Sequence, residues 1–468
     1  MKETSADVPC CVEGPADFVP KAQYALQMLL IPLGINPVWC ARASIAEGGI
    51  YYGNEPAGLA PAVLQLPLAP ATPQYFETKT RYDTSGVHWQ EAADERFPVL
   101  FGGPEPDTFD YVASAFFWLS GWQEYTIQNR DRHGRFSWAD SMQAVLDTVY
   151  TPVVDCYRAV LRRQLLQHGI PVRERTWAGK TWAFCPTHDI DYIWKWRPGM
   201  VYREVVEYGL LNRRHVGVGA RVKRLGAFIA DALKPGDIFR QSLDRMIDEV
   251  HKRGGKATYF FKTGAHGPHD VYYAPSNGYL RRTLKRLAQL GFEVGLHPSY
   301  YAHTHPDYMQ EEKAALADIT SQPLVSVRQH YLRYTYPHTM RLQEAAGFTV
   351  DSTLGFSDHE GFRHGTCHPF LRYDILKNKS TTVWEVPLCF MDGTLFNYRN
   401  MGFEEALAAA QTLILTCKKH GGVCVGLWHN MLWDEMDFPG WGAHFEQTLD
   451  FVVKEQGEIT TLQDVCQE

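Results

Sequence analysis

WAFCPTHDID, residues 182–191, is a short apolar run that ends in two carboxylates. Between the β-rich runs that follow it, apolar residues recur with a helical period and stop at glycines, as from Phe239 to Gly254. This alternation predicts a mainly parallel α/β fold, either a barrel or a doubly wound sheet. The other six runs are KATYFFKTG (256–264), FEVGLHPSY (292–300), VSVRQHYL (325–332), FTVDSTLGF (348–356), VWEVPLCF (383–390) and GVCVGLWHN (422–430).

Side chains capable of chemistry gather where these runs end. Asp189 and Asp191 are two residues apart on one strand, so both point to the same side. Active sites of parallel α/β folds lie at the carboxyl ends of the strands. Two carboxylates beside several imidazoles suit a divalent metal and an acid/base pair. Singly, a strand-end histidine can be structural and an aspartate can cap a helix. The other strand-end residues are His297, Arg328, His330, Asp351 and His429.

The composition is that of an ordinary globular protein, and the length predicts two or three domains. The chain has 468 residues, 45% of them hydrophobic, and a net charge of -7. This acidic balance argues against nucleic-acid binding, which depends on cations that neutralise phosphates. The ten cysteines form no C-x-x-C pair, and the N-terminus lacks the pattern of a signal peptide. We therefore expect a reduced, cytoplasmic protein.

The first part of the chain differs from the rest and is expected to form its own α/β domain. It mixes short apolar runs with proline-rich loops, and two helices are expected over 111–125 and 151–169. The charged stretch RDRHGRFSW (130–138) lies between them as a turn. The polar segment after Gly169 predicts a boundary, which gives domains of 1–178 and 179–468.

An insertion, residues 194–237, separates the first strand from its expected helix. Seven basic residues and three acids lie between Arg203 and Lys234. One interpretation is a solvated helical excursion. The other is a basic amphipathic segment, 203–234, that makes weak contact with a membrane surface or meets a phosphorylated substrate.

The ordered motifs resemble those of the NodB-type polysaccharide deacetylases, carbohydrate esterase family 4. They are THDID (187–191), GLHPSY (295–300), RQHYLRY (328–334), DSTLGF (351–356) and LWHN (427–430). The whole chain resembles a bacterial subgroup of surface-polysaccharide or lipopolysaccharide biosynthesis with an extra N-terminal domain, to which SAFFWLSGWQEY (114–125) and RDRHGRFSW belong. The resemblance implies a deformed (β/α)7 barrel preceded by a smaller α/β domain.

The resemblance also implies a metal site. Asp189 matches the catalytic base, and Ile190 separates it from Asp191, which becomes the metal ligand. His297 matches the first histidine ligand, but Tyr301 stands where the family usually has the second. The candidates for the third ligand are His330, which we favour, and His303, His305, His266 and His269.

Further roles concern the acid, the base and the substrate. By resemblance, Arg328 orients the base, Tyr331 matches a motif tyrosine, and His429 is the general acid, which Asp351 would orient. Tyr300 or a nearby backbone N–H is a candidate to stabilise the oxyanion. Trp428 offers a flat surface for a sugar or packs in the core. Arg363 is a candidate to bind a carboxylate or phosphate of the substrate.

These expectations combine into a metal-dependent hydrolase that removes an N-acyl group, most simply acetyl, from a sugar. One divalent ion is expected, with zinc preferred over manganese, cobalt and nickel. A cytoplasmic enzyme would act on a sugar-nucleotide or a lipid-linked glycan precursor. The alternatives are an amidase for a small non-sugar amide, and a glycan-binding or scaffold protein that has lost turnover.

Overall fold

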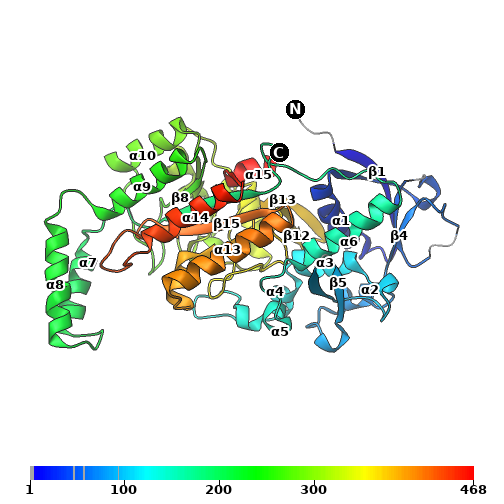
Figure 1. Ribbon diagram of the computed structural model, residues 1–468, viewed down its shortest axis with the longest axis horizontal. Coiled ribbons are helices and arrows are strands. Elements are labelled where there is room, and N and C mark those ends of the chain that lie inside the picture. The colour runs from blue at the N-terminus through cyan, green and yellow to red at the C-terminus, as the bar shows by residue number, and fades with distance from the viewer. Residues whose placement is uncertain (1–4, 46–47, 56–57, 93, 468) are drawn as a thin grey trace.

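The structure is a computed structural model that describes residues 5–45, 48–55, 58–92 and 94–467. Figure 1 shows an elongated molecule in three parts along its long axis. The N-terminal region lies at one end, a large α/β unit occupies the middle, and a pair of helices projects at the other end. No helix of the described residues is long and apolar enough to cross a membrane.

The N-terminal region is a small α/β unit. Its four strands pair in parallel in the order β2-β1-β3-β4, and a separate antiparallel hairpin, β5-β6, follows. Buried apolar faces of the helices pack together into a core of their own. The strands are β1 (Ala6–Val12), β2 (Ile35–Trp39), β3 (Ile50–Gly53), β4 (Leu64–Pro67), β5 (His88–Ala92) and β6 (Glu95–Val99). The helices are α1 (Val19–Leu30), α2 (Thr72–Thr78), α3 (Tyr111–Leu119), α4 (Trp122–Thr126), α5 (Met142–Leu146) and α6 (Val153–Gln167).

The helix expected over 111–125 is interrupted. Gly121 has φ of +69°, a left-handed conformation that ends α3 and starts α4 in a new direction. A Cβ at this position would lie 2.9 Å from the ring of Tyr336, so glycine also permits the close packing there. The break directs α4, with Glu124, toward the second part of the chain.

The large unit is built on one curled, mostly parallel sheet. Its order is β12-β13-β11-β10-β9-β8-β7-β15-β14, with β16 added beside β7. No ladder among the described residues joins β14 back to β12 or β13, so the barrel stays open. The α/β class and the smaller N-terminal α/β region are confirmed. The strands are β7 (Ala183–Ile190), β8 (Thr258–Phe261), β9 (Glu293–Leu296), β10 (Ser326–Val327), β11 (Val350–Asp351), β12 (Phe370–Asp374), β13 (Lys379–Glu385), β14 (Leu388–Met391), β15 (Val423–His429) and β16 (Glu458–Ile459).

One expected strand, VWEVPLCF, is two strands in the structure. β13 ends at Glu385 and β14 begins at Leu388 on the other side of the sheet opening. Pro387 lies between them, and its missing N–H cannot continue a ladder. The antiparallel β12, which pairs with β13, had no strand signal of its own in our sequence analysis.

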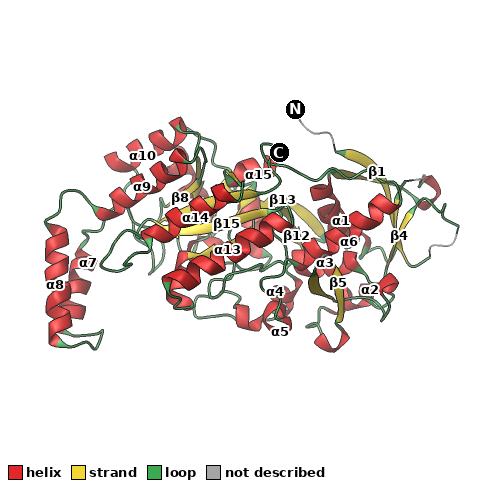
Figure 2. Cartoon of the chain, viewed as in Figure 1, coloured by secondary structure: helices red, strands yellow, loops and turns green. Residues whose placement is uncertain are grey.

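Helices cover the outer face of the curled sheet (Figure 2). Their buried apolar residues, such as Leu243 and Leu284, pack against the outward side chains of the strands. The helices of this unit are α9 (Ile238–Lys252), α10 (Gly278–Gln289), α11 (Pro306–Ala317), α12 (His338–Ala345), α13 (Phe403–Lys419), α14 (Gly442–Lys454) and α15 (Leu462–Gln467), together with α7 (Pro198–Tyr202) and α8 (Val218–Ala232), which project from it.

The two regions share buried contacts and are not joined by a linker alone. Phe370 and Tyr373 of β12 belong to the apolar core of the N-terminal region. The hydroxyl of Tyr24 in α1 donates to the backbone oxygen of Leu371 at 2.6 Å. The boundary predicted at 178/179 falls in the segment between α6 and β7. The N-terminal region therefore has a fixed position from which it can contribute to a site on the barrel.

Candidate metal and active site

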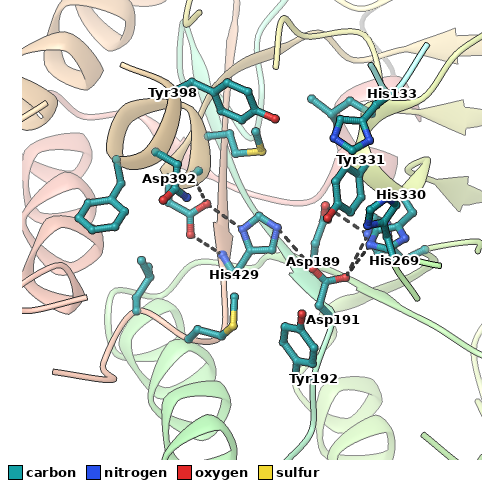
Figure 3. A pocket seen from close by; sticks show the side chains of 18 of the residues that line it. His133, Asp189, Asp191, Tyr192, His269, His330, Tyr331, Asp392, Tyr398 and His429 are labelled. Atoms are coloured by element: carbon teal, nitrogen blue, oxygen red, sulfur yellow. Dashed lines mark hydrogen bonds and ion pairs between the residues drawn. The ribbon is translucent and has the colours of Figure 1, made fainter. Parts of the chain in front are cut away.

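A cavity of about 830 Å³ lies at the carboxyl edge of the parallel strands. In the register of the sheet, His429 at the end of β15 lies opposite Asp189 near the end of β7. His297 and His330 follow β9 and β10 at the same edge. Figure 3 shows the side chains of Asp189, His330 and His429 turned toward one another. The polar lining residues of the barrel include Asp189, Asp191, His269, His297, His330, Tyr331, Asp392 and His429.

Three potential metal ligands meet in this cavity. One ligand atom each from Asp191, His297 and His330 lies within 4.8 Å of the others. The Nε2 atoms of His297 and His330 are 3.5 Å and 3.4 Å from Oδ1 of Asp191. Donors about 2.0–2.1 Å from a tetrahedral zinc lie about 3.3–3.4 Å apart, so the spacing fits one cation. Oδ1 of Asp191 is buried and has no hydrogen-bond partner among the described residues.

The electrostatics of this cluster favour an ionised carboxylate. Burial acts to raise the pKa of Asp191, but the neighbouring imidazoles, with Lys262, lower it well below its usual range. Asp191 in turn raises the pKa of His330 against the effect of burial. A metal needs the neutral imidazole, so binding would compete with a proton on His330.

The histidines are oriented by bonds to their other ring nitrogen. Nδ1 of His297 lies 2.7 Å from the backbone oxygen of Arg328, and Nδ1 of His330 lies 2.7 Å from Oδ1 of Asp270. Each Nδ1–H therefore donates outward and leaves Nε2 free to face Asp191. Nζ of Lys262 donates to the same Oδ1 atom of Asp270 at 2.8 Å. Asp270 and Lys262 are not among the predicted site residues, although Lys262 directly follows β8 and so occupies a strand-end position.

The other four candidate ligands lie outside the cluster. His303 and His305 hydrogen-bond to the backbone oxygens of Tyr300 and Tyr301. His266 stacks on a tyrosine with ring centroids 4.0 Å apart. His269 lines the cavity, but it packs against aromatic rings and not against Asp191. His330 is thus the histidine that the fold brings to Asp191 and His297.

Asp189 lies beside the cluster in contact with a buried arginine. Its carboxylate is 3.4 Å from Nη1 of Arg328 and 3.7 Å from Nε2 of His297. Arg328 is itself fixed by bonds to Thr187 at 2.6 Å and to the backbone and hydroxyl of Ser352, both at 2.8 Å. The arginine cannot swing away, so its charge remains next to Asp189.

His429 is held by Asp392, an acid that the sequence analysis missed. Nδ1 of His429 is 2.8 Å from Oδ1 of Asp392, and the His429 backbone N–H donates to Oδ2 at 2.8 Å. Nε2 points into the cavity, 3.8 Å from Oδ2 of Asp191. Burial would lower the pKa of His429, but Asp392, with the two aspartates of the site, raises it to about 10. Asp392 follows β14, so the strand-end pattern contained the signal.

Asp351 does not orient His429, contrary to the prediction from the sequence. Its Oδ2 atom lies 2.6 Å from Nη1 of Arg372 and 3.1 Å from Nε2 of Gln343. The side chain is fully buried and absent from the cavity wall. Asp351 thus neutralises a buried arginine behind the sheet, and it does not contact His429.

Arg363 and Trp428 are also placed elsewhere than expected. The guanidinium of Arg363 is buried against both oxygens of Glu124, at 2.7 Å and 2.6 Å. Trp428 is fully buried among aromatic rings, including Phe390 and Phe445. Neither lines the cavity. Trp428 alternates with His429 along β15, so it must face the helices when His429 faces the cavity.

The two tyrosines take different positions. Tyr331 lines the cavity, and its φ of +62° is unusual for a bulky residue. Tyr300 lies behind the cavity wall, where its hydroxyl contacts Nδ1 of His133 at 3.0 Å. The backbone N–H of Tyr300 donates to Asp270 at 2.9 Å, so it is engaged within the protein.

The N-terminal region supplies part of the cavity wall through RDRHGRFSW. Arg132, His133 and Arg135 all line the cavity. Arg135 is buried against Asp131 and donates to the hydroxyl of Tyr398 at 2.8 Å. Arg132 is exposed, and its Nε donates to Nε2 of the adjacent His133 at 3.1 Å. The loop therefore brings an accessible positive charge to the site.

The wall opposite the metal cluster is largely apolar. Its residues come from the segment after β14 and from the loop after β15. A cavity with one polar and one apolar wall suits a ligand that carries both kinds of surface. The apolar lining residues are Met391, Phe396, Met431, Leu432 and Phe438.

The Asp392–His429 pair leads to a prediction about pH. If a protonated His429 donates to the leaving group, activity falls as pH rises through its pKa. Replacing the carboxylate in Asp392→Asn removes the charge that raises this pKa, so the alkaline limb of kcat/KM should move down by about one to three pH units. Asp351→Asn is the control, since Asp351 does not contact His429. An unshifted limb in Asp392→Asn would contradict the role of His429.

Comparisons with known proteins bear on parts of the chain. Residues 20–170 match a family of unknown function, DUF7033. No curated protein matches the chain in sequence.

Solved structures similar to this one overlie about three fifths of the chain. A protein of Mycobacterium smegmatis assigned as a polysaccharide deacetylase is 16% identical, with a TM-score of 0.39, over 62% of this chain and 91% of that one. A pseudoenzyme of the CE4 family from Bacillus anthracis is 8% identical, with a TM-score of 0.32, over 60% and 64%. A peptidoglycan N-acetylglucosamine deacetylase from Eubacterium rectale is 13% identical, with a TM-score of 0.29, over 60% and 87%. At these values the likeness bears on no activity of this chain.

Proposed function

We propose that this chain is a metal-dependent hydrolase that removes an N-acyl group, most simply acetyl, from a sugar of a bacterial cell-surface glycan precursor. The observation that carries the proposal is the convergence of Asp191, His297 and His330 in one cavity with Asp189 and His429. A bound divalent cation, with zinc preferred over manganese, cobalt and nickel, would supply a polarised carbonyl and a water of lowered pKa.

Asp189 is the proposed general base. An amide is a weak electrophile, so its attack needs a water that gives up a proton. Nη1 of Arg328 lies 3.4 Å from Oδ1 of Asp189, and this contact holds the carboxylate in position to accept that proton. The carboxylate is almost completely buried, so this charge interaction is weakly screened.

His429 is the proposed general acid. An amine is a poor leaving group unless it is protonated as the C–N bond breaks. Asp392 stabilises the imidazolium and fixes Nδ1 as the inner nitrogen, which leaves the Nε2 proton directed into the cavity. Asp189 and His429 thus approach the same space from adjacent strands, as a base and an acid acting in turn require.

The substrate is proposed to be a sugar carried by a nucleotide or a lipid, including precursors of lipopolysaccharide, acted on in the cytoplasm. Tyr331 provides a ring at the cavity wall, and Arg132 provides a positive charge for a carrier phosphate. The apolar wall formed by Met431, Leu432 and Phe438 suits a carrier with apolar surface. Nucleic acid is not a proposed partner.

The test is acetate release by the purified, metal-reconstituted protein from a panel of N-acetylated sugar nucleotides and lipid-linked sugars. Wild type should release acetate, and Asp189→Asn should lose roughly 10²–10⁴-fold in rate while it keeps its metal, because a base is removed and no ligand is. Release only from non-sugar amides would refute the glycan assignment. A wild-type protein that binds no divalent metal would refute the hydrolase proposal.

A further inference from the structure

The insertion forms a helical hairpin that projects from the barrel. α7 continues into a π-helical segment, Arg203–Leu210, and α8 returns beside it after a turn. In Figure 1 the two arms stand apart from the other helices at one end of the molecule. None of the residues 198–237 lines the described cavity, so the hairpin is not explained by a role in the active site.

The hairpin exposes far more apolar surface than the rest of the protein. Of 22 large hydrophobic side chains that are exposed among the described residues, 11 lie between residues 194 and 233. The largest exposures are 80% for Leu233, 72% for Leu210 and 66% for Val218. A concentration of this kind marks an interaction site, because scattered single residues are the norm elsewhere.

The apolar residues of α8 form one outward stripe. Val218, Val222, Ile229 and Leu233 recur at intervals of four and seven residues, which places them on a single helix face. The opposite face points inward, where Phe228 is buried against the foot of the hairpin. The residues of the outward stripe therefore do not serve to hold the hairpin together.

Positive charge accompanies the exposed stripe. The three acids of 203–234 are all paired with bases, as in Glu204 with Arg224 at 2.7 Å and Asp231 with Lys195 at 2.7 Å. Seven basic residues lie in the same segment; Arg213 and Lys234 are 63% and 71% exposed, although each also pairs with an acid, Glu207 at 3.0 Å and Asp231 at 3.3 Å. Seven bases against three acids leave an excess of four positive charges on the most apolar projection of a protein of net charge -7.

We propose that this hairpin binds the surface of an anionic lipid bilayer. The apolar stripe and tip would enter the interface, and the basic side chains would contact anionic headgroups. Apolar residues are exposed on both arms and at the tip of the projecting hairpin. A fluid lipid surface can cover all of these residues at once. A folded protein partner would need a groove that encloses the hairpin from several sides.

The hairpin is rigidly seated on the loop that follows β15. Asp437 of this loop pairs with Arg203 at 2.8 Å and with Arg224 at 2.6 Å. Met431 and Met436 of the same loop pack with the apolar foot of the hairpin, and Met431 also lines the cavity. Docking of the hairpin would therefore hold one wall of the cavity close to the lipid surface.

The experiment measures flotation of the full-length protein with vesicles. Binding is expected with phosphatidylcholine mixed with phosphatidylglycerol, and weak binding with phosphatidylcholine alone. Leu210→Glu/Leu211→Glu should lower the bound fraction at least tenfold, since it removes apolar surface and adds like charge. Lys223 is an exposed base of α8, so Lys223→Glu should weaken binding by about fivefold or more, and added salt should act in the same direction.

The matched control is Leu415→Glu/Val453→Glu, on exposed positions of α13 and α14 that are 46% and 48% exposed. It should bind vesicles as wild type does. Circular dichroism and light scattering on every variant report folding and oligomeric state. No binding by folded wild type, equal loss in the control, or a wild-type dimer that the Leu210→Glu/Leu211→Glu variant dissociates would overturn the proposal. Because the readout is binding, it is independent of whether the protein deacetylates a sugar.

Discussion

His297→Ala is expected to abolish tight metal binding and to lower the rate of acetate release by roughly 10³-fold or more, because it removes one of three protein ligands. The side chain is 1% exposed, and its Nε2 faces Asp191 at 3.5 Å. Asp191→Ala should have the same effect. Elemental analysis after dialysis and the rate of the reconstituted variant provide the two measurements.

Two further variants, which leave all three ligands in place, test whether the loss of metal is specific to the proposed ligands. Asp270→Asn keeps all three ligands but weakens the bond that orients His330, so metal affinity should fall about 10- to 100-fold and not vanish. His303→Ala is the matched control, because His303 is also a buried histidine near this edge of the barrel but lies outside the cluster. If His303→Ala lost the metal and His297→Ala retained it, the proposed ligand set would be wrong.

Six of the eleven predicted site residues line one cavity, because they follow a local rule. A residue just after a parallel strand lies at the edge where loops converge, and Asp191, His297 and His330 all occupy such positions. The period of two along β7 also put Asp189 and Asp191 on the same side without any knowledge of the tertiary structure.

The same rule failed for the acid that orients His429, because two strand-end aspartates fit this role and only Asp351 was predicted. Asp351 is the last residue of β11 and Asp392 directly follows β14, and the pattern alone does not say which strand lies next to β15. The sheet order places β14 beside β15, so Asp392 meets His429. Asp351 lies several strands away and meets Arg372. Choosing between them required the sheet order, which is a non-local property.

The contacts between the N-terminal region and the large unit could not be predicted from the sequence, because they too are non-local. Arg363 was assigned to the substrate because a lone arginine in a loop has no visible partner in the sequence. Its partner, Glu124, lies 239 residues earlier, on a short helix whose start depends on the left-handed Gly121. The loop with Arg132 reaches the cavity through the same interface.

Glu124→Ala is expected to lower the free energy of unfolding by about 3–5 kcal/mol, the largest stability effect that we predict. Both Glu124 and Arg363 are 3% exposed, and two parallel bonds of 2.7 Å and 2.6 Å join them. Removing the carboxylate leaves a buried guanidinium without its counter-charge, and this uncompensated charge is the source of the loss. Urea titration, monitored by tryptophan fluorescence, measures the change.

The depth of burial, and not the mere presence of an ion pair, determines how much unfolding free energy is lost. A second ion pair, at the surface, tests this. Arg162 and Glu174 approach to 2.6 Å but are 44% and 60% exposed, so Glu174→Ala should cost at most about 1 kcal/mol. Glu124→Leu/Arg363→Met removes both buried charges and should recover most of the lost stability. Low pH should have the same effect as Glu124→Ala. Burial favours the neutral form of Glu124, but Arg363 lowers the pKa of this side chain below its usual range. The contribution of Glu124 to stability is therefore complete at neutral pH and is lost as pH falls through that lowered pKa. Equal losses for the buried and exposed pairs would show that Glu124 contributes no more to stability than a surface charge does.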